Sequence, residues 1–333
     1  MDSLTQIALG AAILGTCAPQ QYTRQAIVFG AVLGTLPDLD VFFHYRDAVD
    51  DFTKHRGFTH SFLFLTPLAL IIWVLLRMFC EPVRENPKPW LIGIMLVLIT
   101  HPLLDAHNAY GTQLFWPFPI PPIMFSTLFV IDPLYTLPLL ATTIFVWIKF
   151  KHKWARNILI GGLALSTTYL IGSWAAKMYV EHQAKEVLAK TGDNYRLFST
   201  PTAFNILLWR IVAVQNNQYH EGYVSLLNPK ATIQFNTHVL SNVPKSVLQF
   251  DDVQRLDWFT QGFNKKQNMG DYMIVSDLRM GYEDNYVFQF AVGATRRGVI
   301  HPIRSIQLES DFNQNDLPLI WDKLVGNEPS KKN

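Results

Sequence analysis

Residues 61–79 read SFLFLTPLALIIWVLLRMF, and this stretch decides the class of the fold. It is apolar up to Arg77 and has the roughly 17–25 residues that a helix needs to cross a bilayer. The chain of 333 residues is 49% hydrophobic and 16% charged, with a formal net charge of +2, whereas a soluble protein is about a quarter charged. This composition excludes a disordered chain, a disulfide scaffold and a nucleic-acid binder that relies on bulk positive charge. We therefore expect no nucleic-acid binding.

Five more apolar segments flank this stretch in the first half of the chain. They are residues 4–18, 25–43, 90–104, 126–148 and 157–176. The first of them is short enough to be a partial or tilted span. Residues 1–176 hold only 10 acidic and 11 basic residues, against 16 and 17 in residues 177–333. We predict an α-helical integral membrane domain of about six segments over residues 1–176.

Lysine and arginine in the short loops predict the orientation of these segments. The loops at 77–88 and 149–156 are rich in basic residues, which is typical of the cytoplasmic side, while residues 106–125 have none. This pattern predicts a multi-pass protein of the cytoplasmic (inner) membrane with both termini outside. The connection 45–60 is an exception, because it carries three basic residues on the predicted outer side.

The second half of the chain has the composition of an ordinary globular domain. Period-2 runs such as ATIQFNTHVL at 231–240 and YVFQFAV at 286–292 are typical of half-buried strands. We predict a helical linker over 177–200 and a small extracytoplasmic α+β or β-rich domain over 201–327. The tail, residues 328–333, is expected to be disordered.

Ionisable residues gather at the predicted outer ends of the apolar segments. They are Asp2, Asp38, Asp40, His55, Arg56, His60, His101, Asp105 and Asp132. Such groups are costly near hydrocarbon and therefore suggest function. His101 and Asp105 are four residues apart, which places both on one face of a helix, as two ligands of one ion require.

Histidine nitrogen combined with carboxylate oxygen is the ligand set of zinc, or of a dinuclear site of zinc, manganese or iron. We expect the metal ligands to be Asp38, His60, His101, Asp105 and Asp2. A catalytic ion of this kind keeps a position for water and lowers the pKa of that water, so that a hydroxide nucleophile exists near neutral pH.

The remaining polar residues have two interpretations each. Asp40 or His55 would be a further ligand or a general base, although Asp38 and Asp40 are also common turn residues beside a proline. Arg56 would either pair with the aspartates or hold an anionic group of the substrate. Asp132, which precedes Pro133, is equally a helix cap or a site residue.

At these motifs the sequence resembles the YdjM-like family, whose members are described as membrane-bound metal-dependent hydrolases. The matching stretches are MDSLT at 1–5, GTLPDLD at 34–40, HRGFTHS at 55–61, THPLLD at 100–105, YGTQ at 110–113 and IDPLY at 131–135. Residues 201–210 and 221–223 also resemble the C-terminal part of longer members. The resemblance implies a membrane-bound hydrolase whose metal site lies in these motifs.

The chain departs from the family at one position, since Gln6 stands where members usually have histidine. If that histidine is a ligand, this chain has lost it, or Asp2 or Gln6 substitutes weakly. A more distant likeness, at Asp38, His60 and the His101–Asp105 pair, is to zinc-dependent phospholipase C and P1 nuclease. It implies one to three zinc ions and phosphoester hydrolysis.

These observations favour a metal-dependent hydrolase at the outer membrane face that acts on a phosphoester or lipid substrate. A site at the membrane edge meets lipid headgroups without extracting them, so the bilayer itself is an expected partner. One alternative is an ion- or proton-coupled transporter, which would place ionisable residues at the midplane. The other is a structural membrane protein in which a closed, four-ligand metal site only holds helices together.

Overall fold

The computed structural model describes residues 1–190, 194–215, 217–228, 232–282, 285–310 and 323–324, and the predicted disordered tail lies outside them. The chain forms two compact units. The first contains Met1–Phe43 and Arg56–Ser173, and the second contains His44–His55 and Trp174–Asn333. A short piece of the N-terminal half, residues 44–55, thus belongs to the C-terminal unit, whereas the sequence predicted residues 1–176 as one domain.

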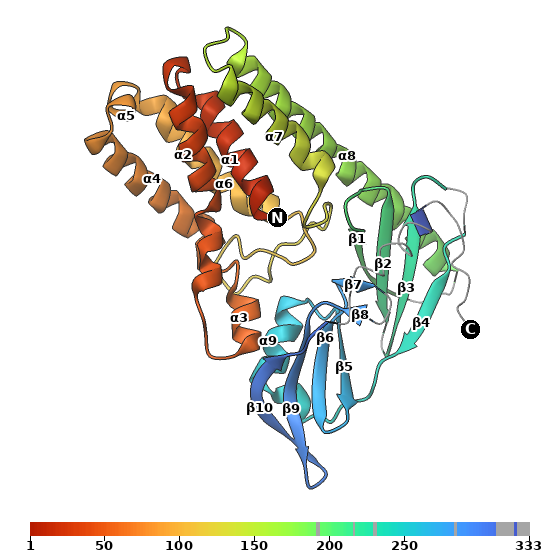
Figure 1. Cartoon of the computed structure of the whole chain (residues 1–333). Coiled ribbons are helices and arrows are strands. Elements are labelled where there is room, and N and C mark those ends of the chain that lie inside the picture. The colour runs from red at the N-terminus through yellow and green to blue at the C-terminus, as the bar shows by residue number, and fades with distance from the viewer. Residues whose placement is uncertain (191–193, 216, 229–231, 283–284, 311–322, 325–333) are drawn as a thin grey trace. The chain divides into compact units, whose positions relative to one another are not determined.

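The first unit consists of helices (Figure 1). Its elements are α1 (Ser3–Cys17), α2 (Thr23–Thr35), α4 (Phe62–Phe79), α5 (Glu81–Glu85), α6 (Pro87–Asp105), α7 (Pro133–Ile148) and the first part of α8 (Ala155–Ala189), with short 3-10 helices η1 (Gln20–Tyr22), η2 (Pro37–Phe42) and η3 (Phe58–His60). Helix α1 contacts α2, α6 and α7. The predicted apolar helices of the N-terminal half are therefore present.

Among the residues that the structure describes, four helical segments are long and apolar enough to cross a membrane. They are Gln20–Phe42, Phe62–Phe79, Pro87–Asp105 and Ala155–Ala189, while α1 and α7 are shorter apolar helices. The six predicted segments thus all coincide with apolar helices, but four of them reach spanning length. The count of six spans and their orientation stay predictions.

One predicted segment begins too early. The sequence predicted residues 126–148 as a span, but α7 starts at Pro133. The reason is a cap, because the Asp132 carboxylate accepts the backbone N–H groups of Leu134 and Tyr135 at 3.1 and 3.3 Å. Proline at the first helical position supports the same start, since its missing N–H is not needed there.

Glycines bring α1 and α2 into close contact. A Cβ atom at Gly34 would lie 2.4 Å from the backbone oxygen of Gln6, and one at Gly10 would lie 2.2 Å from that of Gly30. Small residues at such crossings let two apolar helices pack backbone to backbone, which is how helices associate in membranes. This contact places the start of α1 beside the end of α2.

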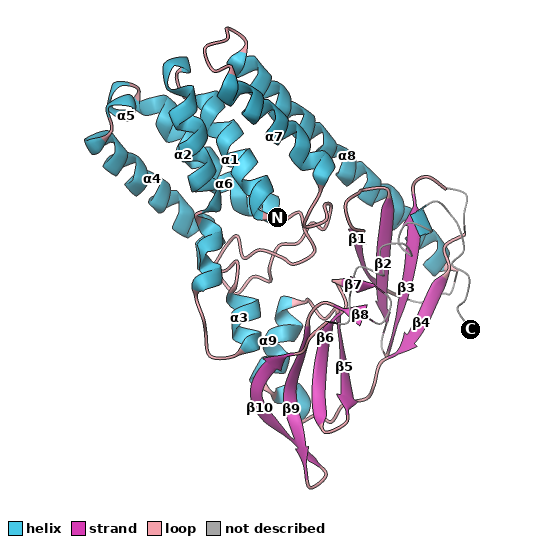
Figure 2. Cartoon of the chain, in the orientation of Figure 1, coloured by secondary structure: helices cyan, strands magenta, loops and turns pink. Residues whose placement is uncertain are grey.

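The second unit is rich in antiparallel β-structure (Figure 2), as the sequence predicted. One sheet has the order β1-β2-β3-β4, with β1 (Arg196–Pro201), β2 (Leu208–Gln215), β3 (Gln218–Ser225) and β4 (Phe235–Val239). The other has the order β10-β9-β6-β5, with β5 (Asn264–Met269), β6 (Tyr272–Asp277), β9 (Gln289–Arg296) and β10 (Val299–Gln307), and β7 (Gly281–Tyr282) pairs with β8 (Asn285–Tyr286). Strand β1 starts at Arg196, inside the stretch predicted as a helical linker.

Residues 44–55, which lie between two parts of the first unit in the sequence, pack into this second unit. It contains α3 (Ala48–Lys54), and the Phe52 ring lies 4.6–5.0 Å from those of Phe259, Phe288 and Phe290. Arg255, from α9 (Asp251–Phe259), donates to the Thr53 hydroxyl at 2.9 Å. Helix α3 is therefore part of this unit's core rather than a loop between spans.

Candidate metal centre

Four of the residues that the sequence singled out as metal ligands lie together in the first unit. Asp38, His60, His101 and Asp105 each present one ligand atom, and these four atoms lie within 4.8 Å of one another. The two histidines and Asp105 are buried, while the Asp38 side chain is 21% exposed. The cluster is therefore closed on the side of Asp105 and reaches the surface at Asp38.

The spacing of these atoms fits one tetrahedrally bound ion. The two Nε2 atoms are 3.3 Å apart, and each lies 3.4 Å from Asp38 Oδ1. Asp105 Oδ2 is 3.1 Å from the His60 nitrogen and 3.6 Å from that of His101. Ligands about 2.0–2.1 Å from a tetrahedral zinc ion lie about 3.3–3.4 Å from one another. Five of the six separations are thus close to the edges of such a tetrahedron, and all six lie within 4.8 Å.

Local structure explains why these residues meet. Asp38 follows α2 directly, in the 3-10 turn η2, and His60 ends η3 just before α4 begins. His101 and Asp105 stand one turn apart on the last turns of α6. Helices α2 and α6 run in one direction and α4 runs in the opposite direction. The C-terminal ends of α2 and α6 and the N-terminal end of α4 therefore lie together, and the cluster forms there.

Hydrogen bonds to the second ring nitrogen fix the tautomer of both histidines. His101 Nδ1 lies 2.8 Å from the Gly34 carbonyl oxygen, which can only accept, so Nδ1 carries the proton. His60 Nδ1 lies 3.0 Å from the Thr59 hydroxyl, and that hydroxyl donates to Asp40 Oδ2 at 2.9 Å. The Thr59 oxygen therefore accepts from His60. Both Nε2 atoms are left with lone pairs, as in metal-bound histidines.

The two carboxylates of the cluster favour a bound cation. Two carboxylate oxygens and two imidazole nitrogens converge here, and Asp105 Oδ2 is buried with no hydrogen-bond partner. Burial opposes charge on the His60 imidazole, but the Asp105 and Asp38 carboxylates outweigh burial and raise its pKa above the ordinary 6.5. A buried acceptor without a donor is costly, and a bound ion would remove that cost.

Gln6 supports Asp105 from α1. It is buried, and its side-chain amide donates to Asp105 Oδ1 at 3.0 Å and to the His101 carbonyl oxygen at 3.2 Å. The α-amino group of Met1 also pairs with Asp105 Oδ1. The residue that the sequence marked as a lost ligand therefore orients a carboxylate that faces the cluster.

Arg56 is the cationic side chain beside the cluster. It is buried in a left-handed backbone conformation, at φ 56°, and its backbone N–H donates to Asp40 Oδ2 at 2.9 Å. Its Nε lies 3.3 Å from Asp105 Oδ2, and its guanidinium stands over the Tyr110 ring at 5.2 Å. Both Nε and Nη1 are buried without a hydrogen-bond partner. Strain and unsatisfied donors at one residue are features of functional sites.

Comparison with known proteins agrees with this picture. The YdjM inner membrane protein family matches residues 1–180, which is more than half of the chain. The chain belongs to the YdjM inner membrane protein family. The uncharacterized protein YfhP of Bacillus subtilis (strain 168) is 23% identical over 313 residues, which cover 85% of this chain and 92% of YfhP. No solved structure matches the chain significantly.

Three other predicted site residues of this YdjM family member lie outside the four-ligand cluster. Asp2, predicted as a ligand, instead caps α1, because its carboxylate accepts the Thr5 N–H at 3.1 Å. Asp40 acts on the cluster indirectly. Its Oδ2 accepts from the Thr59 hydroxyl, which contacts His60, and from the Arg56 backbone N–H. His55 follows α3 and falls in the second unit. These positions argue against Asp2 as a ligand and leave Asp40 as a positioning residue.

Asp132 is also separate from the cluster. Besides capping α7, its carboxylate accepts the Tyr169 hydroxyl at 3.0 Å from α8. Of the two interpretations open at the sequence level, the structure supports the cap.

An apolar pocket adjoins the metal centre. It encloses about 220 Å³ between the η2 turn and the start of α4, and Asp40 and Thr59 lie in its wall beside Phe43, Phe58 and Phe64. Asp38, the exposed ligand, lies between the wall residues Pro37 and Leu39. An apolar group seated in this pocket would therefore lie next to the cluster.

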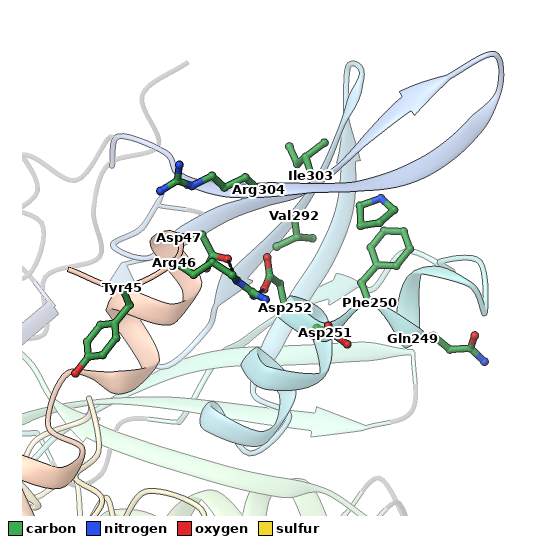
Figure 3. Close-up of a pocket in the computed structure, with 11 residues that line it drawn as sticks. Tyr45, Arg46, Asp47, Gln249, Phe250, Asp251, Asp252, Val292, Ile303 and Arg304 are labelled. Atoms are coloured by element: carbon green, nitrogen blue, oxygen red, sulfur yellow. Dashed lines mark hydrogen bonds and ion pairs between the residues drawn. The ribbon is translucent and has the colours of Figure 1, made fainter. Parts of the chain in front are cut away.

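A larger cavity, of about 720 Å³, lies within the second unit (Figure 3). Arg46, Asp47 and Asp252 line it, and the arginine pairs with the two aspartates at 2.7 and 2.9 Å. Because the Arg46 guanidinium pairs with both of these carboxylates, they do not form a converging set of acceptors like that of the YdjM-type cluster.

Proposed function

We propose that this protein is a membrane-bound, metal-dependent hydrolase of phosphoesters, with lipids as the natural substrate class. The observation that carries the proposal is the convergence of four potential ligand atoms beside an arginine with unsatisfied donors. Asp38, His60, His101 and Asp105 would hold the ion, and zinc suits the ligand set and the spacing. Bound there, the ion would polarise a phosphoryl oxygen and make water nucleophilic near neutral pH.

Arg56 supplies the recognition of an anionic group. Its guanidinium is fixed from two sides, by Asp105 and by the Tyr110 ring, yet Nη1 makes no hydrogen bond. A planar guanidinium is suited to bind phosphate oxygens through paired N–H groups. A phosphate that reaches the cluster past Asp38 would meet this donor beside the ion.

The surroundings of the cluster support a lipid rather than a soluble phosphoester. The ligands stand at the ends of apolar helices, and the adjoining pocket is lined by phenylalanine and leucine side chains. A lipid could place its phosphate at the cluster and part of a hydrocarbon chain in this pocket. We further propose that the centre faces the outer side of the inner membrane, with the C-terminal unit on that same side.

The test is a lipid-hydrolysis assay on the purified full chain in phospholipid vesicles, before and after removal of metal by a chelator. Metal-loaded protein should release the phosphorylated headgroup, and His60→Ala should lose both the metal and the turnover. Arg56→Gln should keep the metal and lose turnover. His182→Ala, an exposed histidine of α8, is the matched control and should behave as wild type.

A second candidate, a purely structural metal site, is favoured by one observation. The cluster offers four protein ligands at tetrahedral spacing, whereas a catalytic zinc usually has three plus water. A structural ion would make the unfolding temperature depend on metal. Metal that stabilises the wild type without any headgroup release would support this second function and reject the hydrolase.

A further inference from the structure

The first unit has an apolar groove at the end of the helices opposite to the metal centre. It encloses about 590 Å³ and is lined by α2, the ends of α4 and α7, α5 and the start of α6. Trp90 of the groove and His101 of the cluster are 11 residues apart on α6, which is about 16 Å along the axis. The groove is therefore separate from the proposed active site.

The α2 side of the groove has a charged end and an apolar remainder. Arg24, Val28 and Val32 follow one another at four-residue intervals on α2, so they form one stripe with the cation at its end. The stripe extends over about 12 Å of helix. Both valines are about half exposed although they lie in a candidate span. This arrangement fits a ligand with an anionic head and a hydrocarbon chain.

Arg24 is held in place at the mouth of the groove. Its Nε donates to the Trp147 carbonyl oxygen at 2.9 Å, and its guanidinium lies over the Phe150 ring at 4.1 Å. Its two terminal nitrogens make no hydrogen bond within the part of the chain that the structure describes. An arginine that is anchored through Nε and an aromatic face keeps those two donors available for a phosphate.

A second unsatisfied donor belongs to Trp90, one of the residues that line the groove. Trp90 is only 3% exposed, and its indole N–H is buried without a hydrogen-bond partner. A buried tryptophan N–H normally has an acceptor, because leaving it unpaired is costly. An ester or phosphate oxygen of a lipid in the groove would provide this acceptor.

We propose that this groove binds one anionic phospholipid from the leaflet at the basic end of the helices. The surrounding charge favours an anionic lipid, because this end carries seven basic residues besides Arg24 and only two acidic ones. The basic residues are Arg77, Arg84, Lys88, Lys149, Lys151, Lys153 and Arg156, and the acidic ones are Glu81 and Glu85. Basic residues beside membrane helices attract anionic lipids in this way. The phosphate binds Arg24, an oxygen accepts from Trp90, and one acyl chain lies along Val28 and Val32.

Native mass spectrometry of the detergent-purified, delipidated full chain tests the proposal. The probes are phosphatidylglycerol, phosphatidylcholine and inorganic phosphate, each titrated separately. One phosphatidylglycerol should bind per chain more tightly than phosphatidylcholine, and inorganic phosphate should not replace it. Equal binding of both lipids, binding of phosphate alone, or a lipid-free dimer that buries the groove would overturn the proposal.

Four variants locate the site. Arg24→Gln should weaken phosphatidylglycerol binding roughly tenfold, and Trp90→Phe, which keeps the ring but removes the N–H, roughly threefold. Val32→Trp should block the groove from an exposed position that does not threaten folding. Arg296→Gln removes an exposed arginine of β9 that belongs neither to the lining nor to this basic set, and it is the matched control. Unchanged affinity in both Arg24→Gln and Val32→Trp would place the lipid elsewhere and refute the assignment.

Discussion

The Nε2 atoms of His60 and His101 lie 3.3 Å apart, and in the neutral tautomer that each Nδ1 contact favours, both Nε2 atoms present a lone pair. Each ring donates its Nδ1 proton away from the partner, to the Thr59 hydroxyl and to the Gly34 carbonyl oxygen. Two lone pairs at this distance repel unless a cation lies between them. This pair is therefore the strongest single sign of a metal site in the molecule.

Replacement of His101 by alanine should remove the metal. Purified wild-type protein is expected to contain stoichiometric divalent metal by elemental analysis, and His101→Ala to contain little, because one of four ligands is lost. His152→Ala, an exposed histidine at the start of the α8 region, should retain it. A wild-type protein without stoichiometric metal would contradict the site itself.

Gln6→Ala should weaken metal binding without abolishing it. The substitution removes the amide that donates to Asp105 Oδ1, and loss of such supporting hydrogen bonds lowers metal affinity by about 10–100-fold. Competition with a chelator measures the change. Gln20→Ala, which alters an exposed glutamine of the same unit, should leave the affinity unchanged. Equal affinities in the two variants would show that Gln6 has no supporting role.

Gly34→Ala should destabilise the protein. The added Cβ would lie 2.4 Å from the Gln6 backbone oxygen, and a backbone atom between two packed helices cannot move aside cheaply. We expect a loss of about 1–3 kcal/mol, measured by unfolding in detergent. Gly161→Ala on α8 is the control, because nothing lies within 4 Å of its Cβ. A loss of stability at both glycines would point to a general effect rather than to the α1–α2 contact.

The second unit should lose stability as the pH rises above 10. Burial, and next the Glu221 carboxylate, raise the pKa of the Tyr223 hydroxyl well above its ordinary 10.0. Above that pH the unfolded chain releases a proton that the folded unit retains, so unfolding becomes more favourable. Tyr223→Phe should reduce this dependence, as unfolding temperatures at increasing pH would show. An unchanged slope in the variant would assign the alkaline loss to other groups.

Much of the candidate site could be predicted from the sequence because it lies at the ends of apolar segments. Polar side chains are costly there, and loop charges indicate which ends share a membrane face. Asp38, His60, His101 and Asp105 stand out by this reasoning. Asp2 stood out equally, but an aspartate before a helix serves as a cap as readily as a ligand, and the sequence does not separate the two.

Other features could not be predicted because they depend on tertiary contacts. Gln6 is noticeable only as a departure from a motif, and its hydrogen bond to Asp105 follows from the close packing of α1 and α2. Residues 44–55 form a polar connection with a weak helical pattern, and only the aromatic cluster around Phe52 assigns them to the second unit. Strand β1 begins at Arg196, within the predicted helical linker, because it pairs with β2. The sequence of this stretch alone does not indicate that pairing.

The excursion at residues 44–55 means that no single cut of the chain separates the two units. A protein ended after Ser173 would keep α3 but lose Phe259, Phe288 and Phe290, so Phe52 would present its ring to water and favour aggregation. A truncation made to isolate the helical unit would thus leave α3 in the product without the unit that normally buries it. Clean separation requires a second edit that joins Phe43 to Arg56 through a short artificial linker. By the same reasoning, the α3 segment supplied as a separate peptide should restore a C-terminal fragment that lacks it.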